Sequence, residues 1–472
     1  MSKAVEKRVY GTVDASPVKS FFVSMLTRDI QLSDAILDLL DNSVDGILRK
    51  KKGKVGDDKP YKGFFAEIEF DKDSFLIRDN CGGIPWSLHD YAFRMGRADP
   101  NRDDGVPTVG TYGIGMKRAL FKMGEQCLIA TQNGQDKYVV QIDPSWIKDE
   151  EKWDIPVKPD NTAMKEDGTE ILIKQLHGGI SSQFGTDHEA FESDLTKKIA
   201  THYAFIIDKG FAVKINGNAV TPKPTKLVFS NEKTTRAIRP FLYRTEHDGV
   251  KVFVAVGFTR PIPSQDSVND EQQEKKHSSL DAGWTIVCND RAVLYCDRTE
   301  LTGWGEAGVP SYHNQFIAIS GIAEFVSTDA SKLPTTTSKR GIDASSTLYL
   351  RVKNKMREGM AIFTDYTNKW KGRTEEAKSH MEHAPALSLD VLKERAEKLQ
   401  FTNVGTKTQR GTQYKPKLPI PEDRNGHVAH ITFKKPMSDV EVLAEYLFED
   451  AKKPPSKVGE KCFDEMLKEA KK

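Results

Sequence analysis

The stretch AILDLLDNSVDG, residues 35–46, combines an apolar helix face with a crowded polar one. Its polar side chains include Asp38, Asp41, Asn42 and Asp45, whose spacing places all four on or near one face of a helix. Like charges three or four residues apart repel, so this crowding is mildly destabilising by itself. A solvated helix face is the simplest explanation for any one of these acids, and a bound cation is the alternative.

The apolar side of the same segment predicts a buried helix. Ile36, Leu40, Val44 and Ile47 recur at helical spacing opposite the acids, so we expect a helix over residues 29–50. The elements expected after it are strands at FFAEIEF and SFLIRD, a helix near 86–96, a helix at MKRALFKMG, and strands at CLIATQNG, KYVVQI and GTEILIKQL. This order predicts an α+β fold that begins with an α/β sandwich, in which helices cover one face of a mixed sheet.

The composition is that of an ordinary globular protein with more than one core. The 472 residues are 38% hydrophobic and 29% charged, and the net charge of +2 argues against a protein that coats a polyanion. Five scattered cysteines without a CxxC pair argue against a zinc site or a disulfide framework. The sequence shows neither a signal peptide nor an apolar run of about 18 residues, so we expect a cytoplasmic protein with no membrane segment.

The segment IRDNCGGI, residues 77–84, ends a strand in a glycine turn. Asp79 at the strand end can accept a hydrogen bond from an exocyclic amino group. Gly82 and Gly83 would let a flat ring approach the backbone closely. An Asp-Asn turn followed by two glycines is also a common turn with no ligand, and that reading stays open.

A second glycine-rich segment, VGTYGIGMKRA at residues 109–119, leads directly into a helix. Gly110, Gly113 and Gly115 would expose backbone N–H groups at a helix N-terminus, which is a suitable cradle for phosphate. The segment lacks the GxxxxGK[ST] pattern, and no acidic residue follows about 20 residues later to bind a ribose.

These motifs, taken in order, resemble the GHKL superfamily of ATPases. That superfamily includes gyrase-type subunits, the mismatch-repair protein MutL, heat-shock chaperones, sensor histidine kinases and the MORC proteins. DLLDNSVDG is similar to the family's N box, DNCGGI to its first glycine box and GTYGIG to its second. The resemblance covers roughly residues 25–200, and GTYGIGMK looks closest to the MORC and MutL-like branch.

The resemblance implies a role for each matching position, with ATP and Mg²⁺ as ligands. Asp38 would be the general base or water-orienting acid, Asn42 the magnesium ligand and Asp79 the adenine reader. Gly83 would allow close approach of the base, and Thr169 would support the adenine. Gly110, Gly113 and Gly115 would wrap the phosphates as part of a lid over about 97–115, and Lys117 would contact a phosphate. We expect Asp41 and Asp45 to be supporting polar contacts.

Two positions depart from the family pattern. The catalytic acid of the family is usually glutamate, and the shorter Asp38 reaches about one methylene less far, so hydrolysis is expected to be slow. The first glycine box usually reads DxGxG, whereas Cys81 stands here in its third position. Asp79 and Gly83 keep their spacing, so adenine reading should survive with an altered turn.

A second unit follows, with strand-like segments and a long helix. HYAFIID, FAVKING, VKVFVAVGF, WTIVCNDRAVLY and QFIAISGIAEF read as strands, and STLYLRVKNKMREGMAIFTDY reads as a helix. It resembles the transducer domain of the gyrase and MutL branches, which sends a loop lysine to the γ-phosphate. Lys339, in KLPTTTSKRGID, is the candidate, although an ordinary basic loop explains it equally well.

We therefore expect four parts. They are an N-terminal arm at 1–25, an ATPase domain at 26–200, a transducer-like α/β domain at 201–370, and a linker with a small helical module at 371–472, with helical pieces at about 387–400 and 438–452.

The favoured function is an ATPase that acts as a conformational switch or clamp and dimerises when ATP binds, with an effector protein or DNA as partner in DNA maintenance or phage defence. The alternative is a non-hydrolysing, nucleotide-gated module that binds nucleic acid or another partner, suggested by Asp38 and the basic stretch 407–417. A sensor kinase fits poorly, because neither a membrane segment nor a helical hairpin with an acceptor histidine is evident. The charged middle and C-terminal dimerisation regions of the chaperones are not evident either.

Overall fold

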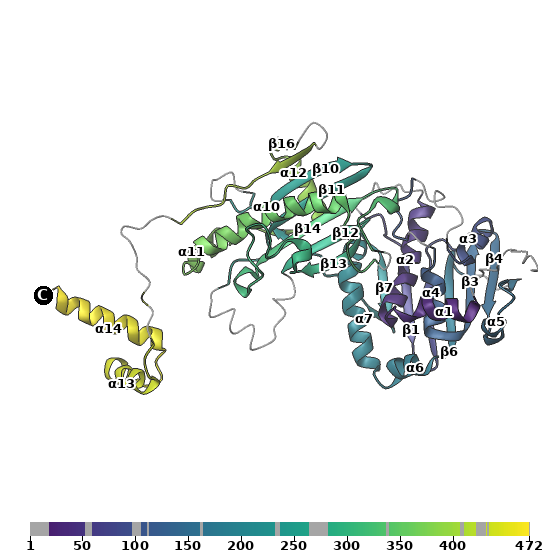
Figure 1. The fold of residues 1–472 in the computed structure, drawn as a ribbon, viewed down its shortest axis with the longest axis horizontal. Helices are drawn as coiled ribbons and strands as arrows, with labels where there is room; N and C mark the ends of the chain where they lie inside the picture. The colour runs from purple at the N-terminus through teal and green to yellow at the C-terminus, as the bar shows by residue number, and fades with distance from the viewer. Residues whose placement is uncertain are drawn as a thin grey trace, which may run out of the picture. The chain divides into compact units, whose positions relative to one another are not determined.

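The chain forms two compact units, Met1–Ile420 and Pro421–Lys472 (Figure 1). The structure is a computed structural model, and it describes residues 18–51, 59–96, 105–110, 113–160, 164–231, 237–263, 282–336, 339–405, 410–421, 431 and 434–471.

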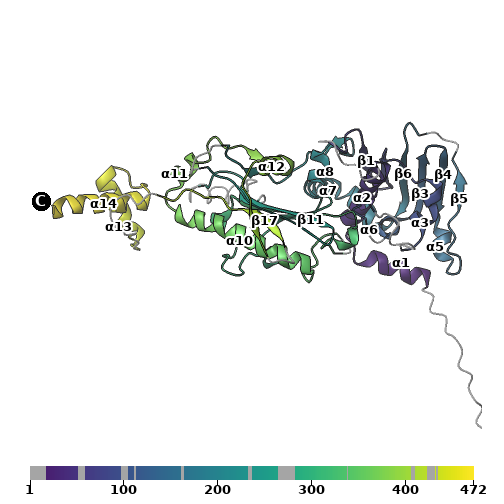
Figure 2. The same ribbon diagram turned by 90° about the horizontal axis from the view of Figure 1, so that it is seen from above.

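The first unit begins with an eight-stranded mixed sheet (Figure 2). Its strands pair antiparallel, except for the parallel pair β1 and β7. Their order across the sheet is β5 (Val157–Pro159), β4 (Asp136–Ile142), β3 (Gly124–Asn133), β6 (Gly168–Leu176), β2 (Ser74–Asp79), β1 (Phe65–Phe70), β7 (Ala212–Ile215) and β8 (Asn218–Ala219).

Helices cover this sheet because its strands alternate between buried and less buried side chains, which is the pattern of a sheet with one covered face. The apolar stripe Ile36, Leu40, Val44 and Ile47 is fully buried in that core, as the sequence predicted. The helices of this part are α1 (Lys19–Arg28), α2 (Leu32–Lys50), α3 (His89–Phe93), α4 (Gly115–Met123), α5 (Pro144–Lys148), α6 (Gly178–Gly185), α7 (His188–His202) and α8 (Ala204–Asp208).

The first sheet extends further along the chain than the sequence suggested. HYAFIID, expected as a strand, contains the end of α7 and α8, because a short apolar run fits a buried helix as well as a strand. FAVKING supplies β7, which pairs with β1 of the first sheet rather than with the second sheet, and β8 follows directly after it. The expected domain boundary at 200 therefore falls inside α7. The expected N-terminal arm, 1–25, lies partly outside the described residues, and its last part belongs to α1, which packs on α4.

The second sheet is also mixed and has seven strands. Helix α10 (Thr347–Lys369) packs on one face, and α8 and α12 (Leu389–Ala396) contribute to a core on the other. Burial on both faces explains the nearly continuous apolar run of β11. The strand order across this second sheet is β13 (Arg291–Asp297), β12 (Gly283–Cys288), β14 (Ile319–Val326), β11 (Val250–Phe258), β10 (Phe241–His247), β17 (Gly411–Tyr414) and β16 (Thr402–Val404). In addition, β9 (Leu227–Val228) pairs separately with β15 (Ala386–Leu387).

Part of the expected linker belongs to this second sheet. Residues 402–404 and 411–414 form β16 and β17, which continue the sheet beyond β10, and α11 (Thr374–Ser379) and α12 precede them. The separate C-terminal unit contains α13 (Met437–Phe448) and α14 (Pro455–Ala470). The sequence had predicted α13 but not α14.

The predicted fold class is confirmed: a mixed sheet with helices, a second mixed-sheet domain and C-terminal helices. None of the helices in the described ranges is both long enough and apolar enough to cross a membrane.

Candidate functional site

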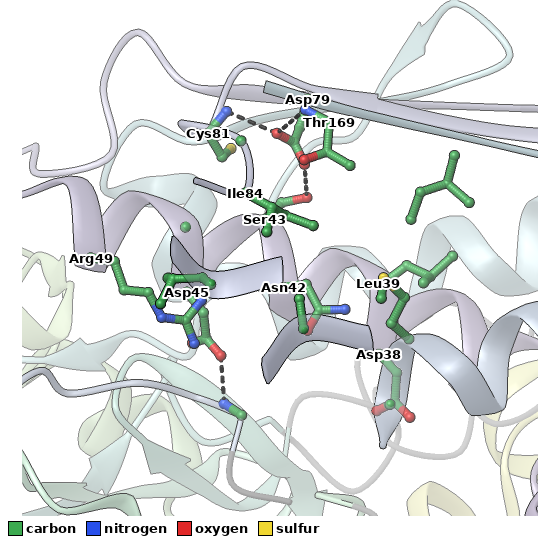
Figure 3. A pocket seen from close by; sticks show the side chains of 18 of the residues that line it. Asp38, Leu39, Asn42, Ser43, Asp45, Arg49, Asp79, Cys81, Ile84 and Thr169 are labelled. Atoms are coloured by element: carbon green, nitrogen blue, oxygen red, sulfur yellow. Dashed lines mark hydrogen bonds between the residues drawn. The ribbon is translucent and has the colours of Figure 1, made fainter. Parts of the chain in front are cut away.

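A cavity of about 340 Å³ lies beside α2, and it is lined by α2, the end of β2, the glycine turn after it and the start of α4 (Figure 3). In Figure 3, Asn42 and Asp38 lie along α2, and Asp79 lies at the end of β2 beside Thr169 and Cys81. The cavity thus brings together residues from all three predicted motifs. A loop that follows β14 of the second sheet contributes Lys339 to its lining.

Asp79 is held at one end of the cavity by three hydrogen bonds. Its Oδ1 accepts from the backbone N–H of Cys81 at 2.9 Å and of Thr169 at 3.3 Å. Its Oδ2 accepts from the hydroxyl of Ser43 on α2 at 2.7 Å. Burial raises the pKa of Asp79, and these hydrogen bonds offset part of that effect. Asp79 and Thr169 are directly paired on β2 and β6, which explains why two residues 90 positions apart share one site.

The glycine turn after Asp79 is needed for packing. Gly83 has φ +65°, and a Cβ there would lie 2.0 Å from the backbone oxygen of Gln132 on β3. The close approach that requires glycine at 83 is therefore to the sheet, in addition to any approach by a base. Gly82 also has a positive φ, whereas Cys81 does not, so a side chain fits at 81 where the family pattern has glycine. The Cys81 side chain is buried.

The second glycine segment is clamped to α2. The Asp45 carboxylate accepts the backbone N–H of Val109 at 2.6 Å and of Gly110 at 2.8 Å. The Gly110 N–H, expected to bind phosphate, is thus bound to Asp45. Gly115 packs directly against Asp38, where an added Cβ would lie 3.3 Å from the aspartate side chain. Much of the expected lid, 97–115, lies outside the described residues, namely its parts 97–104 and 111–112.

Lys117 lies in the first turn of α4 and lines the cavity. Its ammonium donates to the backbone oxygen of Ala92 at 2.9 Å and to that of Gly113. Burial lowers the pKa of Lys117 to about 8. Lys117 therefore ties the glycine segment, at Gly113, to α3, and its charge lies at the helix start where phosphate was expected.

Asp38 is buried beside Arg118, and the two side chains form an ion pair. The sequence singled out Lys117 rather than Arg118, although both stand at the start of the same helix. Asn42, one turn along α2 from Asp38, is exposed and lines the cavity. Its amide oxygen is available in kind for a hard cation such as magnesium.

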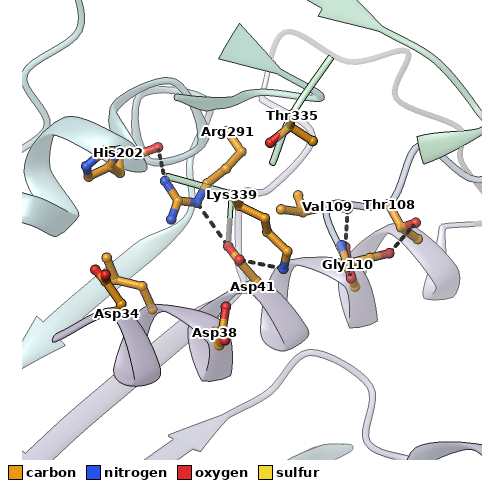
Figure 4. A network of polar contacts seen from close by, with 12 residues as sticks. Asp34, Asp38, Asp41, Thr108, Val109, Gly110, His202, Arg291, Thr335 and Lys339 are labelled. Atoms are coloured by element: carbon orange, nitrogen blue, oxygen red, sulfur yellow. Dashed lines mark hydrogen bonds and ion pairs between the residues drawn. The ribbon is translucent and has the colours of Figure 1, made fainter. Parts of the chain in front are cut away.

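Asp41 joins α2 to the second sheet (Figure 4). Its carboxylate pairs with Lys339 Nζ at 2.8 Å and with Arg291 Nε at 3.0 Å, and it accepts the hydroxyl of Tyr203. Burial opposes ionisation, but the charges of Lys339 and then Arg291 outweigh it and hold the pKa of Asp41 well below its usual range. Asp41 was expected to be only a supporting contact, and it is the main ionic link between the two sheets among the described residues of this site.

Lys339 reaches Asp41 from a tight loop. Thr335 and Ile342 form a β-bridge across its base, and the Lys339 N–H donates to the Thr336 oxygen at 2.9 Å. Lys339 has φ +55°, a left-handed conformation that costs a non-glycine residue about 1–2 kcal/mol. Such a conformation in a buried cationic residue is typical of a functional position.

Asp38, Asp41 and Asp45 on the acidic face of α2 are buried, Asp34 is partly exposed, and each of the four acids has its own partner. Asp34 pairs with Arg340, Asp38 with Arg118, Asp41 with Lys339 and Arg291, and Asp45 with two N–H groups. Cations exceed acids among the described residues that line the cavity: Arg49, Lys50, Lys117, Arg118 and Lys339 against Asp38, Asp45 and Asp79. A cavity with the Asp79 carboxylate at one end and cations in excess over acids in its lining suits a ligand with an amino group and an anionic tail.

Comparison with known families identifies the first part of the chain. Residues 30–178 match the model of the family described as histidine kinase-, DNA gyrase B-, and HSP90-like ATPase. The chain thus carries a GHKL-type ATPase domain, which implies binding and hydrolysis of ATP. No curated protein matches the chain in sequence.

Proposed function

We propose that this protein binds Mg-ATP in the cavity beside α2, hydrolyses it slowly, and uses the nucleotide to change how the second sheet contacts the ATPase domain. Such a protein is a conformational switch or clamp rather than a metabolic enzyme. The ATPase domain supplies the nucleotide pocket, and the second domain acts as a transducer.

The observation that carries this proposal is the polarity of the cavity. Asp79, fixed by three donors, presents a carboxylate suited to the exocyclic amino group of adenine. Lys117 and Arg118 lie at the start of α4, and Lys339 comes from a loop of the second domain. A purine at the Asp79 end therefore directs its phosphates toward cations from both domains.

The residues present fit magnesium. Asn42 offers a neutral amide oxygen on the exposed part of the α2 face, and a phosphate tail would supply the further oxygens that Mg²⁺ prefers. When bound, the ion would neutralise phosphate charge and polarise the phosphoryl group.

Asp38 is the residue we assign to orienting the attacking water. In this state Arg118 holds its carboxylate, so the acid becomes available only when Arg118 turns to another anion. A terminal phosphate is such an anion. The same ion pair supports the alternative function, a nucleotide-gated binding module that does not hydrolyse ATP.

Two variants separate these functions. Asp79→Asn should weaken ATP binding by about one to two orders of magnitude, measured by isothermal titration calorimetry, whereas Asp38→Asn should retain binding and lose phosphate release. Asp34→Asn removes an equivalent charge from α2 outside the cavity lining and should leave both unchanged. Normal affinity and turnover in both test variants would refute the proposal, and binding without turnover in the wild type would favour the gated module.

We also propose that ATP drives homodimerisation. The expected result is a shift from monomer to dimer by light scattering when a non-hydrolysable ATP analogue and Mg²⁺ are added. A molar mass that does not change with nucleotide contradicts it, and Asp79→Asn is the control that should stay monomeric.

A further inference from the structure

Arg291 is the most deeply buried cation near the site. It begins β13, its side chain is 1% exposed, and its guanidinium lies 4.3 Å from the Tyr203 ring centroid. Besides its ion pair with Asp41, Nη1 donates to the backbone oxygens of Ala292 at 2.9 Å and His202 at 3.4 Å. The neighbouring His202 is neutral, because burial, followed by the charges of Arg291 and Arg340, lowers its pKa to about 3.

Arg291 and Lys339 each bind a different oxygen of the Asp41 carboxylate (Figure 4). Arg291 contacts Oδ1 of Asp41, and Lys339 contacts Oδ2. The other acids near Lys339 have their own partners: Asp38 pairs with Arg118, and Asp45 accepts two N–H groups. This cluster of two cations and one carboxylate has one positive charge in excess, and Lys339 is the member that lines the cavity.

The hairpin that carries Arg291 is anchored to the ATPase domain. Asn289 and Asp290 form the β12–β13 turn, both with positive φ. Asp290 pairs with Lys209 at 2.7 Å and accepts the Tyr61 hydroxyl at 2.9 Å, while the Asn289 amide donates to the Thr108 oxygen at 3.0 Å. Arg291 is thus fixed on both sides, whereas Lys339 lies in a loop outside the sheet.

We infer that Arg291 is a positioning residue that stays with Asp41 when Lys339 turns to the terminal phosphate of ATP. A buried carboxylate that loses its only cation is strongly disfavoured. With Arg291 in place, Asp41 keeps a partner, and Lys339 is free to bind phosphate. Without Arg291, Asp41 and Lys339 form an exclusive pair, and the lysine is retained. This inference rests on the proposed function.

The test compares affinities for a non-hydrolysable ATP analogue and for ADP, measured by calorimetry on the full chain. Only the analogue carries the terminal phosphate, so Arg291→Gln should weaken its binding about tenfold or more and leave ADP within about twofold. Lys339→Met should show the same selective loss. Adding Asp41→Asn to Arg291→Gln removes the acid that retains the lysine and should restore most of the preference for the analogue.

The outcomes separate the two proposals. If the ratio of the affinities for the analogue and for ADP is unchanged in Arg291→Gln, whether or not both become weaker, the inference is overturned and the ATPase proposal stands. The same holds if that ratio is unchanged in Lys339→Met. A wild-type chain that binds neither nucleotide overturns both. If Arg291→Gln does not fold, Arg291→Met, which keeps the packed side-chain stem over Tyr203, replaces it.

Discussion

Replacing Asp79 with asparagine changes the hydrogen-bonding character of one end of the cavity while nearly preserving its shape. The amide oxygen can occupy the position of Oδ1 and still accept the N–H groups of Cys81 and Thr169. The amide nitrogen then faces the Ser43 hydroxyl, now 2.7 Å from Oδ2, and that hydroxyl can rotate to accept. The variant should therefore fold.

The loss should appear in nucleotide affinity. An amide nitrogen is a donor and cannot accept from the amino group of adenine. A hydrogen bond to a charged group contributes about 1.5–3 kcal/mol, so ATP should bind roughly 10- to 150-fold more weakly. GTP presents an oxygen in place of that amino group, so the ratio of ATP to GTP affinity should also fall.

Calorimetric titration with ATP and GTP, beside thermal denaturation, measures both effects. Ser43→Ala is the matched control, because it removes one donor to Asp79 and leaves the acceptor, and its effect should be below about tenfold. Wild-type affinity should also fall at low pH, beginning above the ordinary aspartate pKa of about 3.9, because burial raises the pKa of Asp79 and its protonated form has lost the charged acceptor. An Asp79→Asn variant that binds ATP within about threefold of wild type, with unchanged melting temperature, refutes this account.

Three further predictions concern the glycine turn, the α4 lysine and the hairpin. Gly83→Ala should lower the free energy of unfolding, measured by urea denaturation, by several kcal/mol more than the control Gly134→Ala. Both glycines have φ near +60°, which costs alanine about 1–2 kcal/mol, but only at Gly83 would the Cβ collide with a neighbouring strand. Equal losses in the two variants would contradict this explanation. ATP affinity should weaken from about pH 7 to about pH 9 as Lys117 loses its proton, because burial lowers the pKa of Lys117 to about 8. Lys117→Met should remove this pH dependence. A pH dependence that persists in the variant would show that another group causes it. Asn289→Gly should lower the free energy of unfolding by about 2–4 kcal/mol, because the buried Asn289 amide bridges two segments of the chain. Asn289→Ala should lower it by about 1 kcal/mol more, because φ is +47° at this position. Indistinguishable values for the two variants would show that the turn is not strained.

The sequence determined the elements that depend on local periodicity. The apolar stripe of α2, the alternation in β1 and β2 and the glycine-led start of α4 are all readable within a few residues, and each lies where it was predicted. The order of the three motifs led to the family resemblance, which implied one ligand site for Asp38, Asn42 and Asp79, and all three line one cavity.

Local pattern was insufficient where two structures share one composition. The run around residues 203–208 is apolar enough for a strand, but it packs as a helix, and FAVKING adds to the first sheet because β1 offers it a free edge. Residues 402–404 and 411–414 look like parts of a linker in sequence, and they form strands because β10 has an edge that β17 can pair with. Edge pairing depends on distant chain segments, which periodicity does not register.

The partners of the acidic face were decided by the tertiary structure alone. Spacing showed that Asp38, Asp41 and Asp45 share a face, but Arg118 lies 80 positions from its acid, and Lys339 lies 298 from Asp41. A helix sequence specifies which side chains are polar and leaves open what meets them, because ion pairs form through space. The glycine segment, α4 and the second domain each supply partners to this face, so charges that would repel one another in water are each paired.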